Sequence, residues 1–209
     1  MQLLYLYGFF LALLSSLVLI PILLKYAAQL GLVDNPIGST RKLHKAPIPR
    51  SGGLGIIIPT GIAVLVVLPW DDSVLSFLFS SLVIVGFGLL DDFIELKPIQ
   101  KLFGQTLGVT LAMFGGMIIS DVPFIDNAPT WISYALTFVF VMAVINGVNF
   151  SDGMDGLAAG TTLMALVVIF LLAIEGGNLQ VAIIAASICA ALVGFLRFNT
   201  HPATIFMGD

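Results

Sequence analysis

Charged side chains are scarce in this sequence. Of its 209 residues only 10% are Asp, Glu, Lys or Arg, whereas soluble domains contain about 25%, and 59% are hydrophobic. Cysteine is almost absent as well. Cys189 stands alone inside an apolar run, which excludes an intrachain disulfide and is typical of a small buried side chain. The net charge of −4 offers no basis for nucleic-acid binding. The composition therefore indicates a protein of the lipid bilayer.

The N-terminal apolar segment lacks the features of a secretory signal. Its first cation is Lys25, so there is no basic region ahead of the apolar run. The run is also longer than the roughly 7–15 residues of a signal core, and no small-x-small cleavage site follows it. We interpret it as a retained spanning helix.

A spanning helix needs about 20 mostly apolar residues. The apolar runs are continuous and do not alternate, so they favour helices over strands. We predict an all-α polytopic membrane protein that forms one domain, residues 1–209. Its seven expected transmembrane helices are approximately 3–24, 53–70, 74–90, 102–120, 131–147, 157–174 and 180–196.

The cations all fall at the end of the first span or in the loops after spans 1, 3, 5 and 7. They are Lys25, Arg41, Lys42, Lys45, Arg50, Lys97, Lys101 and Arg197. The loops after spans 2, 4 and 6 contain only acidic charges, namely Asp71, Asp72, Asp121, Asp126 and Glu175. By the positive-inside rule the N-terminus is outside, and the C-terminus and the motif-bearing loops are cytoplasmic.

Two adjacent carboxylates, Asp91 and Asp92, follow the third span in "LLDDFIE". They are either solvated carboxylates that end a helix, with a capping role for the next one, or a site for a hard cation such as Mg²⁺. A cation would relieve the repulsion between them.

Four polar side chains recur every three residues in "NGVNFSDGMDGLAAG": Asn146, Asn149, Asp152 and Asp155. On a helix this spacing places neighbours on one slowly spiralling face. Asp155 could instead cap a helix that begins near Gly156, but capping accounts for one aspartate and not for four polar positions. The pattern favours a functional cluster.

The first cytoplasmic loop, "STRKLHKAPIPRSGG", holds four of the eight cations within ten residues. They set topology and attract anionic headgroups, or they form a phosphate-binding wall beside a glycine-rich turn. Gly52, Gly53 and Gly55 equally suit close helix packing. Cytosolic carboxylates, loop cations and amides at the mouth of a helical bundle together favour phosphoryl-type transfer to a lipid.

These motifs resemble a known family. "HKAPIPRSGG", "LLDDFIELKPIQK", "NGVNFSDGMDGLAAG" and "FMGD" are similar, in order and spacing, to the polyprenyl-phosphate N-acetylhexosamine-1-phosphate transferases. The resemblance covers nearly the whole chain. The "P-x-P-x-x-G-G" form of the first loop is closer to the GlcNAc-type branch than to the phospho-MurNAc-pentapeptide translocase.

The resemblance implies a bacterial inner-membrane enzyme that starts O-antigen, enterobacterial common antigen or teichoic-acid linkage synthesis. It would transfer a UDP-linked N-acetylhexosamine 1-phosphate, most often GlcNAc 1-phosphate, to undecaprenyl phosphate and release UMP. Mg²⁺ is the implied cofactor, with Mn²⁺ as a substitute, and a homodimer is left open.

The family's site residues map onto matching positions. Asp209 matches the metal-binding aspartate, and Asp91 and Asp92 match the catalytic pair that handles the lipid phosphate. The implied substrate-binding residues are Asn146, Asn149, Asp152, Asp155, His44, Lys45, Lys97 and Lys101.

In the family the chain continues past this aspartate into further spans and a histidine-rich loop. We therefore expect a C-terminally truncated part of the family's domain, with weak or no activity on its own. Two other classes remain open, a transporter or ion pathway and an inactive membrane scaffold. The transporter is disfavoured because no acidic residue lies near the middle of a predicted span.

Overall fold

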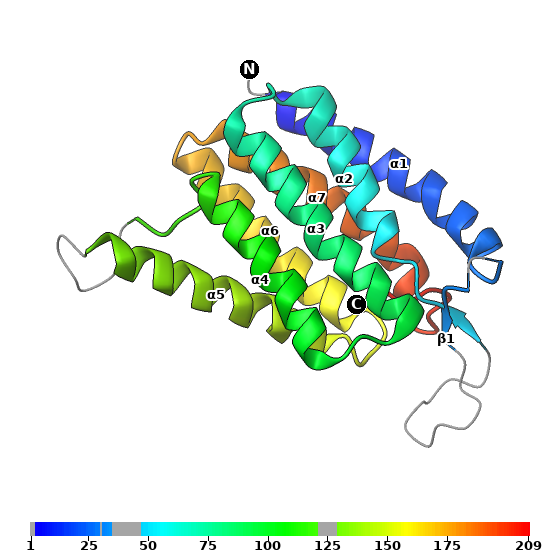
Figure 1. Ribbon diagram of the computed structural model, residues 1–209. Helices are drawn as coiled ribbons and strands as arrows, with labels where there is room; N and C mark the ends of the chain where they lie inside the picture. Colours follow the sequence, from blue (N-terminus) through cyan, green and yellow to red (C-terminus); the bar gives the residue numbers. More distant parts are fainter. Residues whose placement is uncertain (1–2, 30, 35–46, 121–128) are drawn as a thin grey trace. The chain divides into compact units, whose positions relative to one another are not determined.

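The computed structural model describes residues 3–29, 31–34, 47–120 and 129–209. They form two compact units, residues 1–68 with 151–209 and residues 69–150, each considered by itself below. The elements within the described residues are α1 Leu4–Tyr26, β1 Val33–Asp34, β2 Ile48–Pro49, α2 Leu54–Val67, α3 Asp72–Ile94, α4 Pro98–Phe114, α5 Thr130–Ser151, α6 Leu157–Glu175 and α7 Leu179–Asn199 (Figure 1).

The all-α prediction is confirmed for the described residues, apart from one two-residue antiparallel strand pair. A helix occupies each of the seven predicted segments. Five of them, α1, α3, α5, α6 and α7, are long and apolar enough to cross a membrane. The 14 residues of α2 and the 17 of α4 extend only about 21 and 26 Å, against a hydrocarbon core of roughly 30 Å. The count of seven spans and the orientation stay predictions.

The fourth helix differs from its predicted bounds of 102–120. It begins earlier, because Pro98 suits a first helical position and the Gln100 side chain accepts a 2.9 Å hydrogen bond from the Lys97 N–H. It ends at Phe114, because Gly115 and Gly116 follow and Gly116 adopts a left-handed φ of 85°. The predicted end at 120 rested on hydropathy alone, which does not detect helix termination by these glycines.

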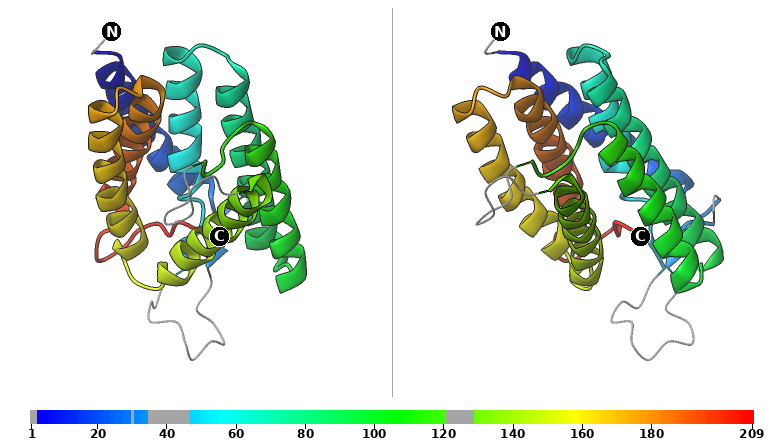
Figure 2. Two further views of the ribbon diagram at one scale, coloured as in Figure 1. Left: turned by 90° about the vertical axis from the view of Figure 1, so that its left-hand side faces the viewer. Right: turned by 60° about the vertical axis from the view of Figure 1, so that its left-hand side comes forward.

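In the first unit, α7 packs against α1, α2 and α6 (Figures 1 and 2). Small residues allow this close approach. A Cβ on Gly8 would lie 2.8 Å from the Ser187 hydroxyl, and one on Gly194 would lie 2.7 Å from the Ser16 hydroxyl. The fully buried Ser16 hydroxyl donates to the carbonyls of Gly55 (2.8 Å) and Ala191 (3.1 Å). One side chain of α1 thereby links α2 and α7, as small and hydroxyl residues do between membrane helices.

In the second unit, α3 and α4 pack along each other. Gly104 and Gly108 of α4 admit the side chains of Phe87 and Ile84 from α3, since a Cβ at either glycine would collide with them.

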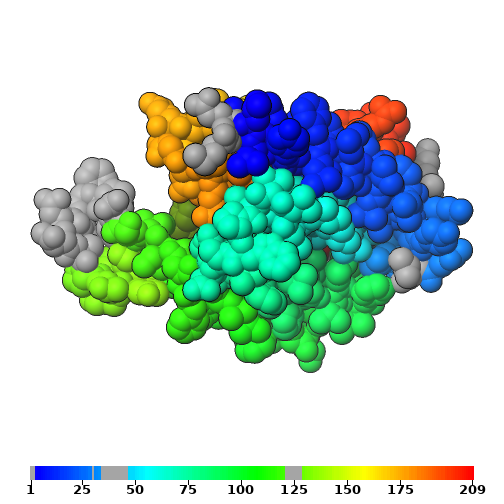
Figure 3. All heavy atoms as spheres, turned by 90° about the horizontal axis from the view of Figure 1, so that it is seen from above, coloured from blue at the N-terminus to red at the C-terminus, as the bar shows by residue number. Residues whose placement is uncertain are grey.

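Large apolar side chains cover the outward surface of α1, which Figure 3 shows in blue along one face. Those more than half exposed are Leu3, Tyr7, Phe10, Leu14 and Val18. An apolar helix surface of this extent is suited to lipid, in agreement with the predicted bilayer location.

Candidate functional site

The turn between α3 and α4 is built around the Asp91 carboxylate. Its Oδ1 accepts a 2.7 Å hydrogen bond from the Leu96 N–H, and its Oδ2 lies 3.1 Å from the Lys101 ammonium. Glu95, with a left-handed φ of 49°, closes α3 just before this turn. The Asp91 side chain is only 11% exposed. Asp91 is therefore not a freely solvated carboxylate, and the Lys101 ammonium offsets its charge, while the divalent-cation site stays a prediction.

Asp92 follows Asp91 on the last turns of α3 and is half-buried. Lys97 precedes α4 and is exposed. The structure thus brings two predicted site residues, Asp91 and Lys101, into direct contact and places Asp92 and Lys97 on the same turn.

The Asn146 side chain makes hydrogen bonds within the protein. Its amide nitrogen donates to the Gln105 Oε1 at 3.0 Å and to the Met142 carbonyl at 2.8 Å, and the Gln105 amide returns a long 3.5 Å contact. Gln105 itself is 5% exposed. This amide pair joins α5 to α4. The contacts give the half-buried Asn146 a role in positioning the two helices, and its substrate contact stays a prediction.

The expected helical stripe is interrupted. Asn146 and the half-buried Asn149 lie on α5, but that helix ends at Ser151, and Asp152 and Asp155 belong to the following turn. Glycines favour this break, since Gly156 has a left-handed φ of 73°. The prediction of one helical face is therefore wrong beyond Ser151.

Asp155 does not cap α6, whose N-cap is Gly156 without a side-chain hydrogen bond. Its Oδ2 instead lies 2.9 Å from the His201 Nδ1 and accepts a 3.1 Å hydrogen bond from the Ala203 N–H. Asn199, which is 3% exposed, accepts from the Gly156 N–H at 3.0 Å and donates to the Ile205 carbonyl at 2.8 Å. The two side chains connect the turn before α6 to the segment after α7.

Asp152, in the turn after α5, lies within electrostatic range of Asp209, and these two carboxylates of the first unit are called the acidic pair below. Partial burial and the negative charge of Asp209 raise the pKa of the Asp152 carboxyl, and the Arg50 guanidinium lowers it in part. Asp152 is half-buried, whereas Asp209 is exposed. A half-buried carboxylate within electrostatic range of a second one is a suitable location for a cation.

The glycine pair before α2 has a definite function in the fold. The Gly52 N–H donates to the Phe206 carbonyl at 2.9 Å, and the Gly53 N–H donates to the Met207 carbonyl at 2.7 Å. These two amides are therefore satisfied by protein carbonyls, and phosphate binding by the cations of this loop stays a prediction. Gly55, in contrast, packs against the side chain of Ile20, as close helix packing requires.

His44 and Lys45 lie outside the described residues, so their predicted phosphate contacts remain predictions. Arg50 was considered above only as one of the four first-loop cations, and Gln105 was not identified from the sequence at all. Arg50 stands inside the "PIPRSGG" motif, where its charge was a usable signal. Gln105 gives no such signal, because a lone amide on an apolar helix does not reveal its partner 41 residues away.

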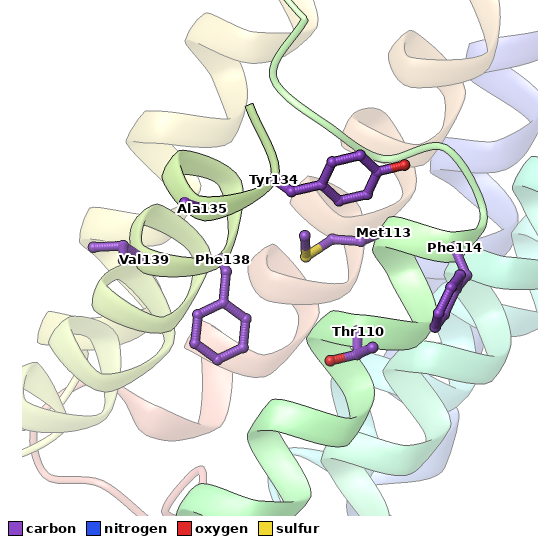
Figure 4. A pocket seen from close by; sticks show the side chains of 7 residues that line it. All are labelled: Thr110, Met113, Phe114, Tyr134, Ala135, Phe138 and Val139. Atoms are coloured by element: carbon purple, nitrogen blue, oxygen red, sulfur yellow. The ribbon is translucent and has the colours of Figure 1, made fainter. Parts of the chain in front are cut away.

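An apolar cavity of about 370 Å³ lies between α4 and α5. Figure 4 shows Met113 of α4 and Phe138 of α5 directed toward the space between the helices. The full lining is Thr110, Met113, Phe114, Tyr134, Ala135, Phe138 and Val139. Its volume lies within the usual range for small-molecule sites, and its lining suits hydrocarbon.

Comparison with known proteins identifies one family and several relatives named as transferases. Residues 74–209 match the family described as glycosyl transferase family 4. The chain is 34% identical, over 97% of its length, to a probable undecaprenyl-phosphate N-acetylglucosaminyl 1-phosphate transferase of Bacillus subtilis, and spans 57% of that protein. It is 30% identical to a phospho-N-acetylmuramoyl-pentapeptide-transferase of Caldanaerobacter subterraneus, over 97% of this chain and 68% of the relative.

A further relative, the phospho-N-acetylmuramoyl-pentapeptide-transferase of Clostridium beijerinckii, is 33% identical over 94% of this chain and 66% of its own length. The chain thus spans between 57% and 68% of these three relatives. The family match covers well over half of the chain and includes the paired aspartates and the acidic pair. By this match the chain belongs to glycosyl transferase family 4.

Proposed function

We propose that the whole protein transfers an N-acetylhexosamine 1-phosphate from a UDP-sugar to undecaprenyl phosphate in the bacterial inner membrane. The acceptor phosphate forms the new bond to the sugar-bearing phosphorus, the bond to UMP breaks, and UMP leaves with its electron pair. GlcNAc 1-phosphate is the proposed group, since the relative with 34% identity carries that name. The product is the first lipid-linked intermediate of an envelope polysaccharide.

The observation that carries this proposal is the acidic pair Asp152 and Asp209 beside Arg50. Among the described residues no group of three His, Cys, Asp or Glu side chains is arranged for a metal ion. Mg²⁺ does not need one, because it is commonly bound by one or two carboxylates together with waters and substrate phosphates. The elevated pKa of the Asp152 carboxyl beside Asp209 fits a site whose charge a cation would offset.

Mg²⁺ bound there would offset charge on the transferring phosphoryl group. Asp152 and Asp209 would hold the ion, and Arg50 would hold an oxygen of the donor diphosphate. Lys101, oriented by Asp91, would bind the acceptor phosphate. The half-buried Asp92 would orient that phosphate for attack.

The acceptor's hydrocarbon tail needs an apolar surface. The cavity between α4 and α5 supports this part of the proposal, because its lining is almost entirely hydrocarbon. The amide pair Asn146 and Gln105 lies on the same two helices and would keep their spacing constant.

The test is UMP release from UDP-GlcNAc by membranes that contain the full-length protein, with and without undecaprenyl phosphate and with Mg²⁺ or a chelator. Release that needs both lipid and metal, and that is lost in Asp209→Asn, is expected. UDP-MurNAc-pentapeptide in place of UDP-GlcNAc tests the donor. Preference for the pentapeptide donor would contradict the GlcNAc assignment, and no lipid-dependent release from either donor would contradict the transferase itself.

A further inference from the structure

The segment before α2 and the segment before Asp209 are held together by three backbone hydrogen bonds. The Phe206 N–H donates to the Pro49 carbonyl at 2.7 Å, and the Gly52 and Gly53 amides donate back to the Phe206 and Met207 carbonyls. These bonds place residues 49–53 alongside residues 206–207. Asp209 follows only two residues after the last bonded carbonyl.

Gly52 makes this pairing sterically feasible. A Cβ at position 52 would lie 2.6 Å from the Phe206 carbonyl oxygen and would also collide with the Phe195 ring. Phe195 is fully buried, so its ring has no free space to enter. Any side chain at position 52 must therefore push the 206–207 backbone away from α2.

A side chain at position 53 would disturb the contact with residues 206–207 less than one at position 52. A Cβ there would lie 3.2 Å from the Met207 carbonyl oxygen, a distance that a small backbone shift can relieve. Gly61, about two turns further along the chain in α2, has no heavy atom within 4 Å of an added Cβ. Substitution by alanine is therefore expected to cause a severe clash at Gly52, a mild one at Gly53 and none at Gly61.

We propose that Gly52 is a positioning residue for Asp209: its close contact with Phe206 sets the place of the Asp209 carboxylate. This inference rests on the proposed function, in which the two carboxylates hold a divalent cation. Between the Met207 carbonyl and Asp209 lies only Gly208, with a left-handed φ of 81°, so a shift at Phe206 is transmitted to the Asp209 carboxylate. Metal affinity then depends on a glycine that contains no ligand atom.

The experiment measures Mn²⁺ binding to the purified full-length protein in detergent by electron paramagnetic resonance of the free ion. Variants are Gly52→Ala, Gly53→Ala and, as the matched control, Gly61→Ala. Loss of a residue that orients a metal ligand typically weakens metal affinity about 10–100-fold, and this range is expected for Gly52→Ala. A smaller loss is expected for Gly53→Ala, and Gly61→Ala should bind within about twofold of the parent, because added Ala in a helix removes no contact.

Thermal unfolding of the same samples without metal separates positioning from a general loss of stability. A glycine needed only for packing would lower the melting temperature of the metal-free protein and leave the Mn²⁺ affinity of the folded protein unchanged, and that result for Gly52→Ala overturns the proposal. If Gly52→Ala does not fold, an unchanged affinity in Gly53→Ala overturns it. If the parent protein binds no Mn²⁺, the metal chemistry of the proposed function fails as well, and this outcome is distinct from the other two.

Discussion

The ion pair between Asp91 and Lys101 allows a quantitative prediction about the α3–α4 turn. Lys101→Met removes the cation, keeps most of the side-chain volume, and retains the hydrogen bond from the Leu96 N–H to the Asp91 carboxylate. The carboxylate is 11% exposed and the lysine 23%, so the pair is neither fully buried nor free in solvent. Stability should fall because a largely desolvated charge loses its counter-ion.

The magnitude follows from that partial burial. Exposed ion pairs contribute about 0–1 kcal/mol, and breaking a buried pair costs about 3–5 kcal/mol. The exposed fraction of Lys101 and the retained hydrogen bond from Leu96 reduce the buried value. We expect Lys101→Met to lower the free energy of unfolding by about 1–3 kcal/mol.

The assay is reversible unfolding in mixed micelles, followed by circular dichroism, for Lys101→Met, Asp91→Asn and the double variant. Because the two side chains contact each other, the double variant should be less destabilised than the sum of the single variants. Lys97→Met is the matched control, since Lys97 is exposed at the start of the same turn. A coupling free energy near zero, or an equal loss in Lys97→Met, would refute the reasoning.

Three further predictions concern single polar side chains. Asn146→Ala should lower the free energy of unfolding by about 1 kcal/mol, because it leaves the buried Gln105 amide without its partner on α5. Gln105→Ala measured alone should give a similar loss. A change in UDP-sugar affinity without any loss of stability would contradict the positioning role. Asp152 has a raised pKa in the folded protein, so its stabilising contribution is present below the ordinary carboxyl pKa and is lost as pH rises through the raised value. In chelator, Asp152→Asn should therefore raise the melting temperature at neutral pH and reduce its pH dependence, and an unchanged profile would count against the acidic pair. Ser51→Ala should be neutral or stabilising by about 1 kcal/mol, because the buried Ser51 hydroxyl has no hydrogen-bond partner among the described residues; a clear loss of melting temperature would show a missed partner.

The helix positions could be predicted from the sequence, because helices in a bilayer are specified by local hydropathy. Each predicted segment contains a helix, and the bounds differ in both directions. The helix α4 ends at Phe114 rather than 120, where Gly115 and Gly116 follow, whereas α5 continues past its predicted end at 147 to Ser151. At the end of α4 the backbone preference of glycine was decisive.

Contacts between distant segments required the tertiary structure. Asn146 finds Gln105, and Asp155 finds the His201 ring and the Ala203 amide, at separations of 41 to 48 residues. Nothing in the local spacing of "NGVNFSDGMDGLAAG" distinguishes an amide that faces a substrate from one that faces another helix. The contact of Asn146 with Gln105 therefore could not be predicted from the motif.

The sequence by itself determined that the chain is a helical membrane protein of a recognisable family, with its carboxylates and cations at helix ends. It could do so because hydropathy, charge placement and motif order are properties of neighbouring residues. Only the tertiary structure decided what those groups touch: Lys101 against Asp91, Asp209 beside Asp152, and the Gly52 and Gly53 amides on the carbonyls before Asp209. Such contacts depend on how segments far apart in the chain pack together, and packing at van der Waals distance depends on every side chain in between.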